Sequence, residues 1–223
     1  MFSFFNNLRT KVLLATHLKD SLSHAVTLRK FPEVKKLVDT GVDINEIDSR
    51  GDTALKQALI IRHSEMILYL LDHGANPNIL CTAKDLKGKV IQPYLKPYQL
   101  LSTISLERHR EILLENQAYL RALVLFGTTR DSLIFHDDNP EALKIFTDTE
   151  QIHHKKSVLE AQVKINSTDE KRLAYNGLGD IWSTLGEQET HVAFKSFYQR
   201  KAVHYRHLSE QLQDSPSERS FEL

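Results

Sequence analysis

The histidines of this sequence are candidate metal ligands, because a neutral imidazole commonly binds metal ions. His204 and His207 are spaced to lie on one face of a helix, and His153 and His154 are adjacent residues that precede two lysines. No cysteine accompanies these pairs, and no glutamate completes a zinc-binding His-Glu-x-x-His motif. We therefore expect solvated helix faces at both places and no metal site.

Other reactive groups form no catalytic pattern. The sequence has no glycine-rich phosphate loop, nucleophile elbow or kinase signature. Gly177 and Gly179 lie inside a helical pattern, which indicates close helix packing, and Asp137 and Asp138 lie in a predicted turn. Cys81 has no basic residue directly beside it, so we expect an unreactive thiol at a surface or edge. These residues predict no catalytic site, no cofactor and no enzymatic activity.

The charge balance excludes several classes of partner. The chain has 29 basic and 29 acidic residues and a pI near 7.2, so it has no bulk attraction for nucleic acid or anionic membranes. Its single cysteine fits a reducing compartment, and no segment approaches the roughly 18 apolar residues of a membrane span. We expect a cytoplasmic protein with no nucleic acid partner and no membrane insertion. The apolar residues 1–5 should pack on the protein, the alternative being a helix that touches a membrane.

One local stretch is basic and aromatic. It contains Lys84, Lys87, Lys89 and Lys96, with Tyr94 and Tyr98 interleaved. We expect a solvated inserted loop here, and the alternative is a contact with phosphate or an acidic partner.

The elements that carry these residues follow from an internal repeat. Gly41 and Gly74 lie 33 residues apart, and residues 22–46 can be laid over residues 55–79 without an insertion. At this offset Leu22, Ala25, Val34, Leu37 and Val38 fall on Leu55, Ala58, Ile67, Leu70 and Leu71. A period near 33 residues is typical of stacked helix–turn–helix units. The sequence therefore predicts an all-α fold, an α-solenoid with short hairpin-like turns.

Helix boundaries in the second unit can be assigned from single residues. Gly51 permits a turn with positive φ, and Thr53 is a good N-cap for the helix that follows. Ser64 can cap the next helix, and Gly74 should end it in the left-handed conformation.

These residues resemble the ankyrin repeat. The matching residues are Asp48, Gly51, Thr53, Leu55, Ala58, His63, Leu70, Leu71, Gly74, Ala75, Asn76 and Asn78. Ala54, Lys56 and Arg62 stand where the family usually has proline, histidine and glycine, and we expect them to weaken the hydrogen bonding of the turn. The resemblance implies an ankyrin-repeat domain over residues 1–136, with two clear repeats at about 16–47 and 48–80 and a degenerate third at 81–130.

In the degenerate repeat, residues 123–127 match residues 70–74, and an insertion of about 20 residues separates the two units. Part of it lies in the turn from Lys84 to Pro93, and part lengthens the helices that follow. Lys96 to Leu101 can start this third repeat.

Residues 137–213 are expected to form a helical C-terminal domain, followed by a flexible tail at 214–223. We expect helices at 140–146 and 150–165, one opened by a capping box at Ser167 and Glu170 and closed by Gly186, and a last from about Gln188 to Leu212. Residues 178–197 resemble one weak tetratricopeptide-like hairpin, the alternative being a generic helical hairpin. A stack of only two or three repeats is too short to be stable by itself, so these helices should cap the stack.

The resemblance also implies a function. In ankyrin-repeat proteins the turn tips and first helices contact the partner, which corresponds here to Ser49, Arg50, Asp52, Ile60 and Ile61. Packing of the two isoleucines beneath the insertion is the alternative. We expect a monomeric protein-interaction module, a scaffold or adaptor that binds another protein. The alternative function is an enzyme with a site between the repeats and the C-terminal helices.

A biological setting is suggested by resemblance alone. A short, degenerate repeat stack with a helical tail resembles ankyrin-type effectors of intracellular bacteria. The polar residues 214–223 resemble C-terminal type IV secretion signals. This implies secretion into the host cell cytosol as the alternative location.

Overall fold

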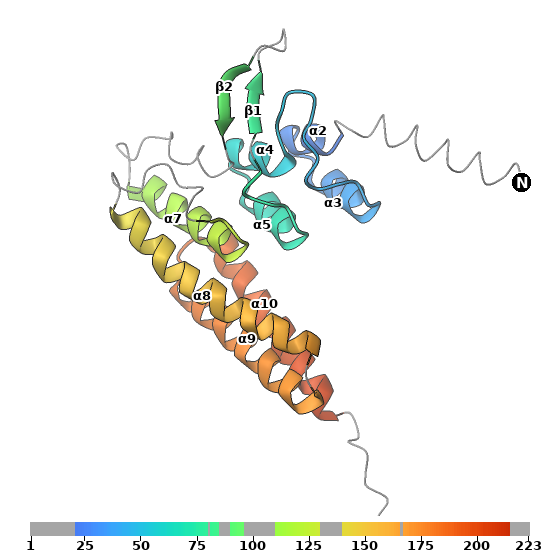
Figure 1. Ribbon diagram of the computed structural model, residues 1–223, viewed down its shortest axis with the longest axis vertical. Coiled ribbons are helices and arrows are strands. Elements are labelled where there is room, and N and C mark those ends of the chain that lie inside the picture. The colour runs from blue at the N-terminus through green and yellow to red at the C-terminus, as the bar shows by residue number, and fades with distance from the viewer. Residues whose placement is uncertain are drawn as a thin grey trace, which may run out of the picture. The chain divides into compact units, whose positions relative to one another are not determined.

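The computed structural model of the protein describes residues 21–79, 81–84, 90–95, 110–129, 140–165 and 167–214. The chain divides into two compact units, Met1–Ala142 and Leu143–Leu223 (Figure 1). The expected domain bounds, and the expected capping of the repeats by the C-terminal helices, stay predictions. None of the described helices is long and apolar enough to cross a bilayer.

Within its described residues, the first unit contains two helical hairpins that follow the 33-residue repeat. Helices α2 (Ser21–Thr27) and α3 (Phe31–Asp39) form the first, and α4 (Ala54–Ile60) and α5 (Ser64–Asp72) form the second. Helix α2 packs against α3 and α4, and α4 packs against α5 (Figure 1). Most apolar side chains that repeat at this period are buried, among them Leu55, Ala58, Ile67 and Leu70, while Leu37 and Val38 are half-buried. The predicted helical repeats are confirmed.

The second helix of each repeat ends in the same way. Gly41, Gly74 and Gly127 have φ values of +84°, +93° and +105°. In each case the residue after the glycine donates its amide to the carbonyl four positions before the glycine, at 2.9 to 3.2 Å. Because this left-handed backbone is inexpensive only for glycine, the shared geometry supports the predicted alignment of residues 123–127 with 70–74.

The two helices of the second repeat begin differently from each other. Thr53 Oγ1 accepts a backbone amide of α4 at 3.2 Å, which confirms the predicted N-cap. The predicted cap of α5 was wrong: Ser64 is the first helical residue, and His63 Nδ1 accepts the amide of Met66 at 3.4 Å. The Ser64 hydroxyl instead shares a 2.8 Å hydrogen bond with Tyr119 of α7 (Arg110–Leu125). This contact joins α5 to the helix of the next repeat.

A β-hairpin lies in the insertion that we expected to be a loop. Strand β1 (Cys81–Lys84) pairs antiparallel with β2 (Val90–Leu95), with Cys81 opposite Leu95 and Lys84 opposite Val90. The adjacent β-branched residues Val90 and Ile91 favour a strand. The fold class stays all-α, because this hairpin is an insertion in a helical stack. The expected start of the third repeat at Lys96, and residues 1–5, lie outside the described residues.

Helix α7 is longer than its counterpart in the second repeat. It has 16 residues, against nine in α5. This agrees with the expectation that part of the insertion lengthens the helices.

Helix α8 (Pro140–Ile165) begins at its predicted proline and is continuous. We expected a break between residues 146 and 150. The hydroxyls of Thr147 and Thr149 donate to the carbonyls of Leu143 and Ile145, one turn earlier, at 3.0 and 2.6 Å. Because these side chains bond back to their own helix, the polar stretch does not interrupt it.

Helix α9 (Thr168–Gln188) begins as predicted, at a capping box in which the Glu170 carboxylate accepts the amide of Ser167 at 3.1 Å. It continues two residues beyond Gly186. Helix α10 (Val192–Asp214) begins four residues later than expected. The reason is Glu189, whose Oε1 accepts the amides of the next two residues at 2.9 and 3.0 Å and so makes a turn of that segment.

Helices α9 and α10 pack closely along their length. A Cβ atom at Gly179 would lie 3.1 Å from Cγ of Arg206, and one at Gly186 would lie 3.1 Å from Cγ of Gln199. On another side of α9, Gly177 faces Leu159 of α8. The glycines therefore allow close helix packing, as predicted, while the tetratricopeptide-like character of the hairpin stays a prediction.

Candidate functional site

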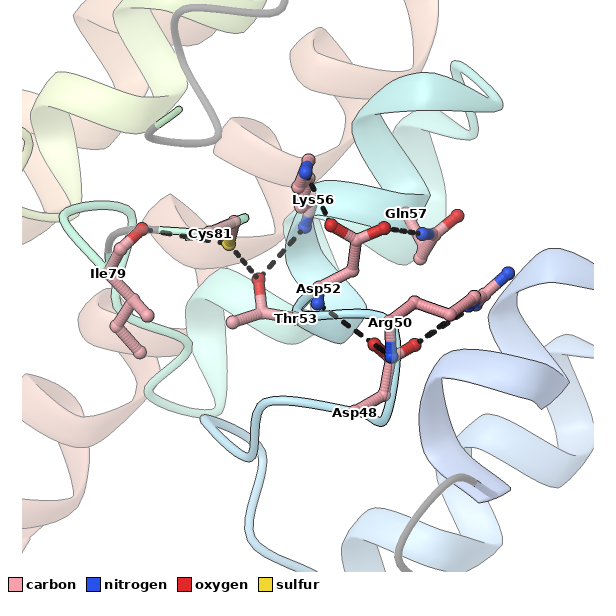
Figure 2. Close-up of polar contacts among 8 residues, drawn as sticks. All are labelled: Asp48, Arg50, Asp52, Thr53, Lys56, Gln57, Ile79 and Cys81. Carbon is pink, nitrogen blue, oxygen red and sulfur yellow. Dashed lines mark hydrogen bonds and ion pairs between the residues drawn. The ribbon is translucent and has the colours of Figure 1, made fainter. Parts of the chain in front are cut away.

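The turn before α4 is organised by one buried carboxylate. Asp48 is 7% exposed, and its Oδ1 accepts the backbone amides of Arg50 and Asp52 at 3.0 and 2.9 Å. Its Oδ2 accepts Nε and Nη2 of the Arg50 guanidinium at 3.2 and 3.0 Å (Figure 2). The Arg50 side chain is still 51% exposed. Because two N–H groups of the guanidinium donate to one oxygen of a buried carboxylate, Asp48 holds this exposed side chain in one orientation.

Directly behind this turn lies a buried polar cluster. Lys56 is 2% exposed and forms an ion pair with Oδ1 of Asp52. Gln57 donates from Nε2 to Oδ2 of the same carboxylate at 2.6 Å (Figure 2). Charged groups are tolerated in such places when they are paired and hydrogen-bonded. The three residues therefore form one interdependent unit at the start of α4.

Cys81, the first residue of β1, is fully buried. We expected it at a surface or edge, but β1 begins directly against the N-terminus of α4. Its Sγ lies 3.7 Å from Oγ1 of Thr53 and donates to the carbonyl of Ile79 at 3.7 Å (Figure 2). Burial raises the pKa of the Cys81 thiol, against the opposing effects of the Thr53 hydrogen bonds and the Lys56 charge. The environment therefore favours the neutral thiol over the nucleophilic thiolate.

Four of the five residues expected to bind a partner reach the surface. Ser49 and Arg50 are exposed, Ile60 is 46% exposed, and Ile61 is partly exposed. Asp52 is buried, contrary to the expected place on the turn tip, because its carboxylate points inward to Lys56 and Gln57.

Helix α4 itself offers little accessible surface. Every residue from 54 to 59 is buried, including the polar Lys56 and Gln57, and Ile60 at its end is exposed. The first-helix face that we expected to meet a partner is therefore reduced to the end of α4. Because Lys56 and Gln57 are polar, a search for apolar residues in the sequence does not predict that they are buried. The available signal was the spacing of Asp52 and Lys56, opposite charges four residues apart.

The histidines that the structure describes do not assemble into a ligand set. Within the described residues no group of three or more His, Cys, Asp or Glu side chains is placed to hold a metal ion. His207 lies 3.9 Å from a carboxylate oxygen of Glu210 and 3.0 Å from the side-chain amide of Gln211. His204 is exposed.

The basic and aromatic stretch is only partly described. Lys84 lies in β1 and Tyr94 in β2. The remaining members, Lys87, Lys89, Lys96 and Tyr98, lie outside the described residues. The choice between a solvated insertion and a phosphate or acidic contact therefore stays open.

Comparison with known proteins agrees with the repeat geometry. Residues 22–71 match a family model described as ankyrin repeats (many copies), so these residues are ankyrin repeats. Ankyrin repeat domain-containing protein 40 of Mus musculus and its counterpart in Homo sapiens are each 38% identical to this chain over 65 residues. That stretch is 29% of this chain and 18% of each relative, so the chain covers less than a fifth of their length. No solved structure matches the chain.

Proposed function

We propose that the protein binds another protein through a repeat-tip surface formed by Ser49, Arg50, Ile60 and Ile61. The proposal rests chiefly on Arg50, an exposed guanidinium fixed in place by the buried Asp48 carboxylate. A side chain that is already ordered loses less conformational entropy on binding. Ankyrin repeats, present at residues 22–71, typically mediate protein–protein interactions.

The chemistry of this surface suits a polar contact at the turn before α4 and an apolar contact at the other end of that helix. Asp48 uses two of the five N–H donors of Arg50, which leaves three for acceptors on a partner. Ile60 and Ile61 contribute exposed apolar area, and interfaces commonly combine such a patch with a polar rim. Asp52, which we expected to touch the partner, is assigned a supporting role beneath the surface.

The expected adaptor role, monomeric state and effector role rest on the sequence. We propose a scaffold or adaptor that acts as a monomer, and nothing in the described part of the chain favours the alternative of an enzyme. The effector role stays a prediction, because residues after Asp214 lie outside the described residues and the similar proteins are from mouse and human.

The experiment is affinity capture with the full chain, followed by mass spectrometry. Arg50→Glu combined with Ile60→Ser should abolish capture of proteins that the wild type retains, since interface energy concentrates in few residues. A matched control, Lys36→Glu with Ile165→Ser, changes one exposed cation and one exposed aliphatic residue elsewhere. Circular dichroism should show native folding for both variants.

The results of this capture experiment distinguish binding at the repeat-tip surface from binding elsewhere on the chain. Loss of capture by the Arg50 variant alone supports the repeat-tip surface. A folded Arg50 variant that captures every partner at the wild-type level would place binding elsewhere on the chain.

A further inference from the structure

Helix α10 carries a local excess of basic residues. Residues 192–207 contain four Lys or Arg residues and two histidines but no Asp or Glu, while the whole chain has a formal net charge of zero. The next acidic residue along α10, Glu210, lies 3.9 Å from His207. The basic segment therefore occupies about the first four turns of the helix, at about 3.6 residues per turn.

Two exposed valines lie among these basic residues, with the exposed Gln199 between them on the same side of the helix. Val192 and Val203, three turns apart on the same side of α10, are 78% and 65% exposed. Helical spacing puts Lys195 and Arg206 on one flank of these valines and Arg200 on the other, and all three are exposed. We call the two valines and these three basic residues the α10 outer face.

The opposite side of α10 fixes this orientation. Phe194, Tyr198 and Ala202 are buried. The stem of Arg206 lies along Gly179 of α9, while its side chain extends to the surface. Because the inner side is committed to packing against α9, the outer face is presented on a rigid element.

We propose that the α10 outer face is a second interaction surface, one that docks an acidic amphipathic helix of a partner protein. Glutamates or aspartates on both edges of such a helix would meet the flanking Lys195, Arg206 and Arg200. Its apolar stripe would cover Val192 and Val203. The surface lies outside the repeats, so the inference goes beyond the function proposed for Ser49 and Arg50.

The valines decide which class of partner fits best. A nucleic acid would be held by cations together with stacking aromatic side chains, and the outer face contains no aromatic residue. An anionic bilayer is usually engaged through large residues such as Trp, Phe or Leu, which the outer face also lacks. A helix with an apolar stripe and acidic edges matches both the valines and the basic residues of the α10 outer face.

The test uses the full chain and a synthetic helical peptide of about 20 residues, whose leucine stripe is flanked by glutamates. Fluorescence anisotropy measures its affinity, and a peptide with lysine in place of glutamate serves as the comparison. Lys195→Glu with Arg200→Glu should weaken binding of the acidic peptide about tenfold or more. Val203→Ser, which leaves the charge unchanged, should weaken it about fivefold.

The matched control is Lys144→Glu with Lys155→Glu, which makes the same charge change at exposed positions of α8. This variant should bind the peptide like the wild type, and circular dichroism should confirm that all variants fold. If the α8 control lost as much affinity for the acidic peptide, net charge alone would explain the loss, and the proposal would be overturned. An unaffected Val203→Ser variant would also overturn it. Binding of RNA or phosphatidylserine vesicles in place of the peptide, sensitive to Lys195 and Arg200, would overturn the proposed partner class.

Discussion

Asn78 contacts the turn of Gly127 across 49 residues of sequence: its Nδ2 donates to the Gly127 carbonyl at 2.7 Å. Its Oδ1 accepts the amide two residues beyond Gly127 at 3.2 Å. Asn45, one repeat earlier, makes the same two contacts around Gly74, at 3.0 and 2.7 Å. Each repeat is thus joined to the next by the same pair of hydrogen bonds, and the recurrence includes the degenerate third repeat.

Asn78→Ala should lower the free energy of unfolding by about 1–2 kcal/mol, because it leaves a backbone carbonyl and an amide of the next turn without their partner. Urea denaturation followed by circular dichroism measures the change. Asn176→Ala, at an exposed position of α9, is the control and should be nearly neutral. A neutral Asn78→Ala variant would mean that the third repeat is not joined through this turn.

Gly74→Val should destabilise the protein by about 1–2 kcal/mol or more, because β-branched residues rarely adopt the φ of +93° found here. Nothing lies within 4 Å of a Cβ atom at this position, so the cost is one of backbone conformation and not of space. Gly74→Asn should cost less, since asparagine tolerates this region. Thermal unfolding that ranks the two variants equally would contradict the left-handed assignment.

Arg62→Gly should stabilise the protein by about 0.5–1 kcal/mol, because Arg62 has a φ of +51° where the ankyrin pattern has glycine. Arg29, 33 residues earlier, has a φ of +57° but also donates from Nη2 to the Ile61 carbonyl at 2.9 Å. Arg29→Gly should therefore gain less. Chemical denaturation of both variants measures which one gains more stability. A destabilised Arg62→Gly protein would show that the Arg62 side chain stabilises the fold by more than its left-handed backbone destabilises it.

Lys56→Met should destabilise the protein by about 3–5 kcal/mol, because the buried Asp52 carboxylate would lose its counter-ion. Adding Asp52→Asn should recover part of this loss, since no buried charge would then remain unpaired. A double-mutant cycle in urea measures the coupling. Additive effects of the two substitutions would indicate that the ion pair contributes nothing as a pair.

Cys81 should resist alkylation by iodoacetamide in the native protein and react after denaturation, as followed by mass spectrometry. Burial raises its pKa above the usual 9.0, so the folded state favours the neutral thiol. The resulting stabilisation is complete below the pKa of the unfolded thiol and is lost as pH rises through the folded value. Stability should therefore fall less steeply above about pH 9 in Cys81→Ala than in the wild type. Rapid native alkylation at pH 8 would contradict the buried thiol.

The repeat architecture could be predicted from sequence because its signals are local and periodic. Apolar residues recur every 33 positions, and the glycines that end the second helices recur with them, as in Gly41 and Gly74. Thr53 and the Ser167–Glu170 capping box depend only on neighbours in the chain, and both were confirmed. The predicted helix break at residues 146–150 and the predicted helix start at Gln188 were wrong. The Thr149 hydroxyl donates within a continuous helix, and the Glu189 carboxylate accepts the amides of a turn that delays the start of α10.

By itself, the sequence determined the helical repeats, the ankyrin resemblance and the residues at the turn tip, since each follows from spacing along the chain. Only the tertiary structure decided which of those residues meet solvent. Asp52 and Lys56 are buried as an ion pair at the start of α4, and Cys81 is buried where β1 begins beside Thr53. The pairing of Asp52 with Lys56 depends only on neighbours in the chain. The burial of a polar group also depends on what packs over it, and Cys81 reaches Thr53 from 28 residues away.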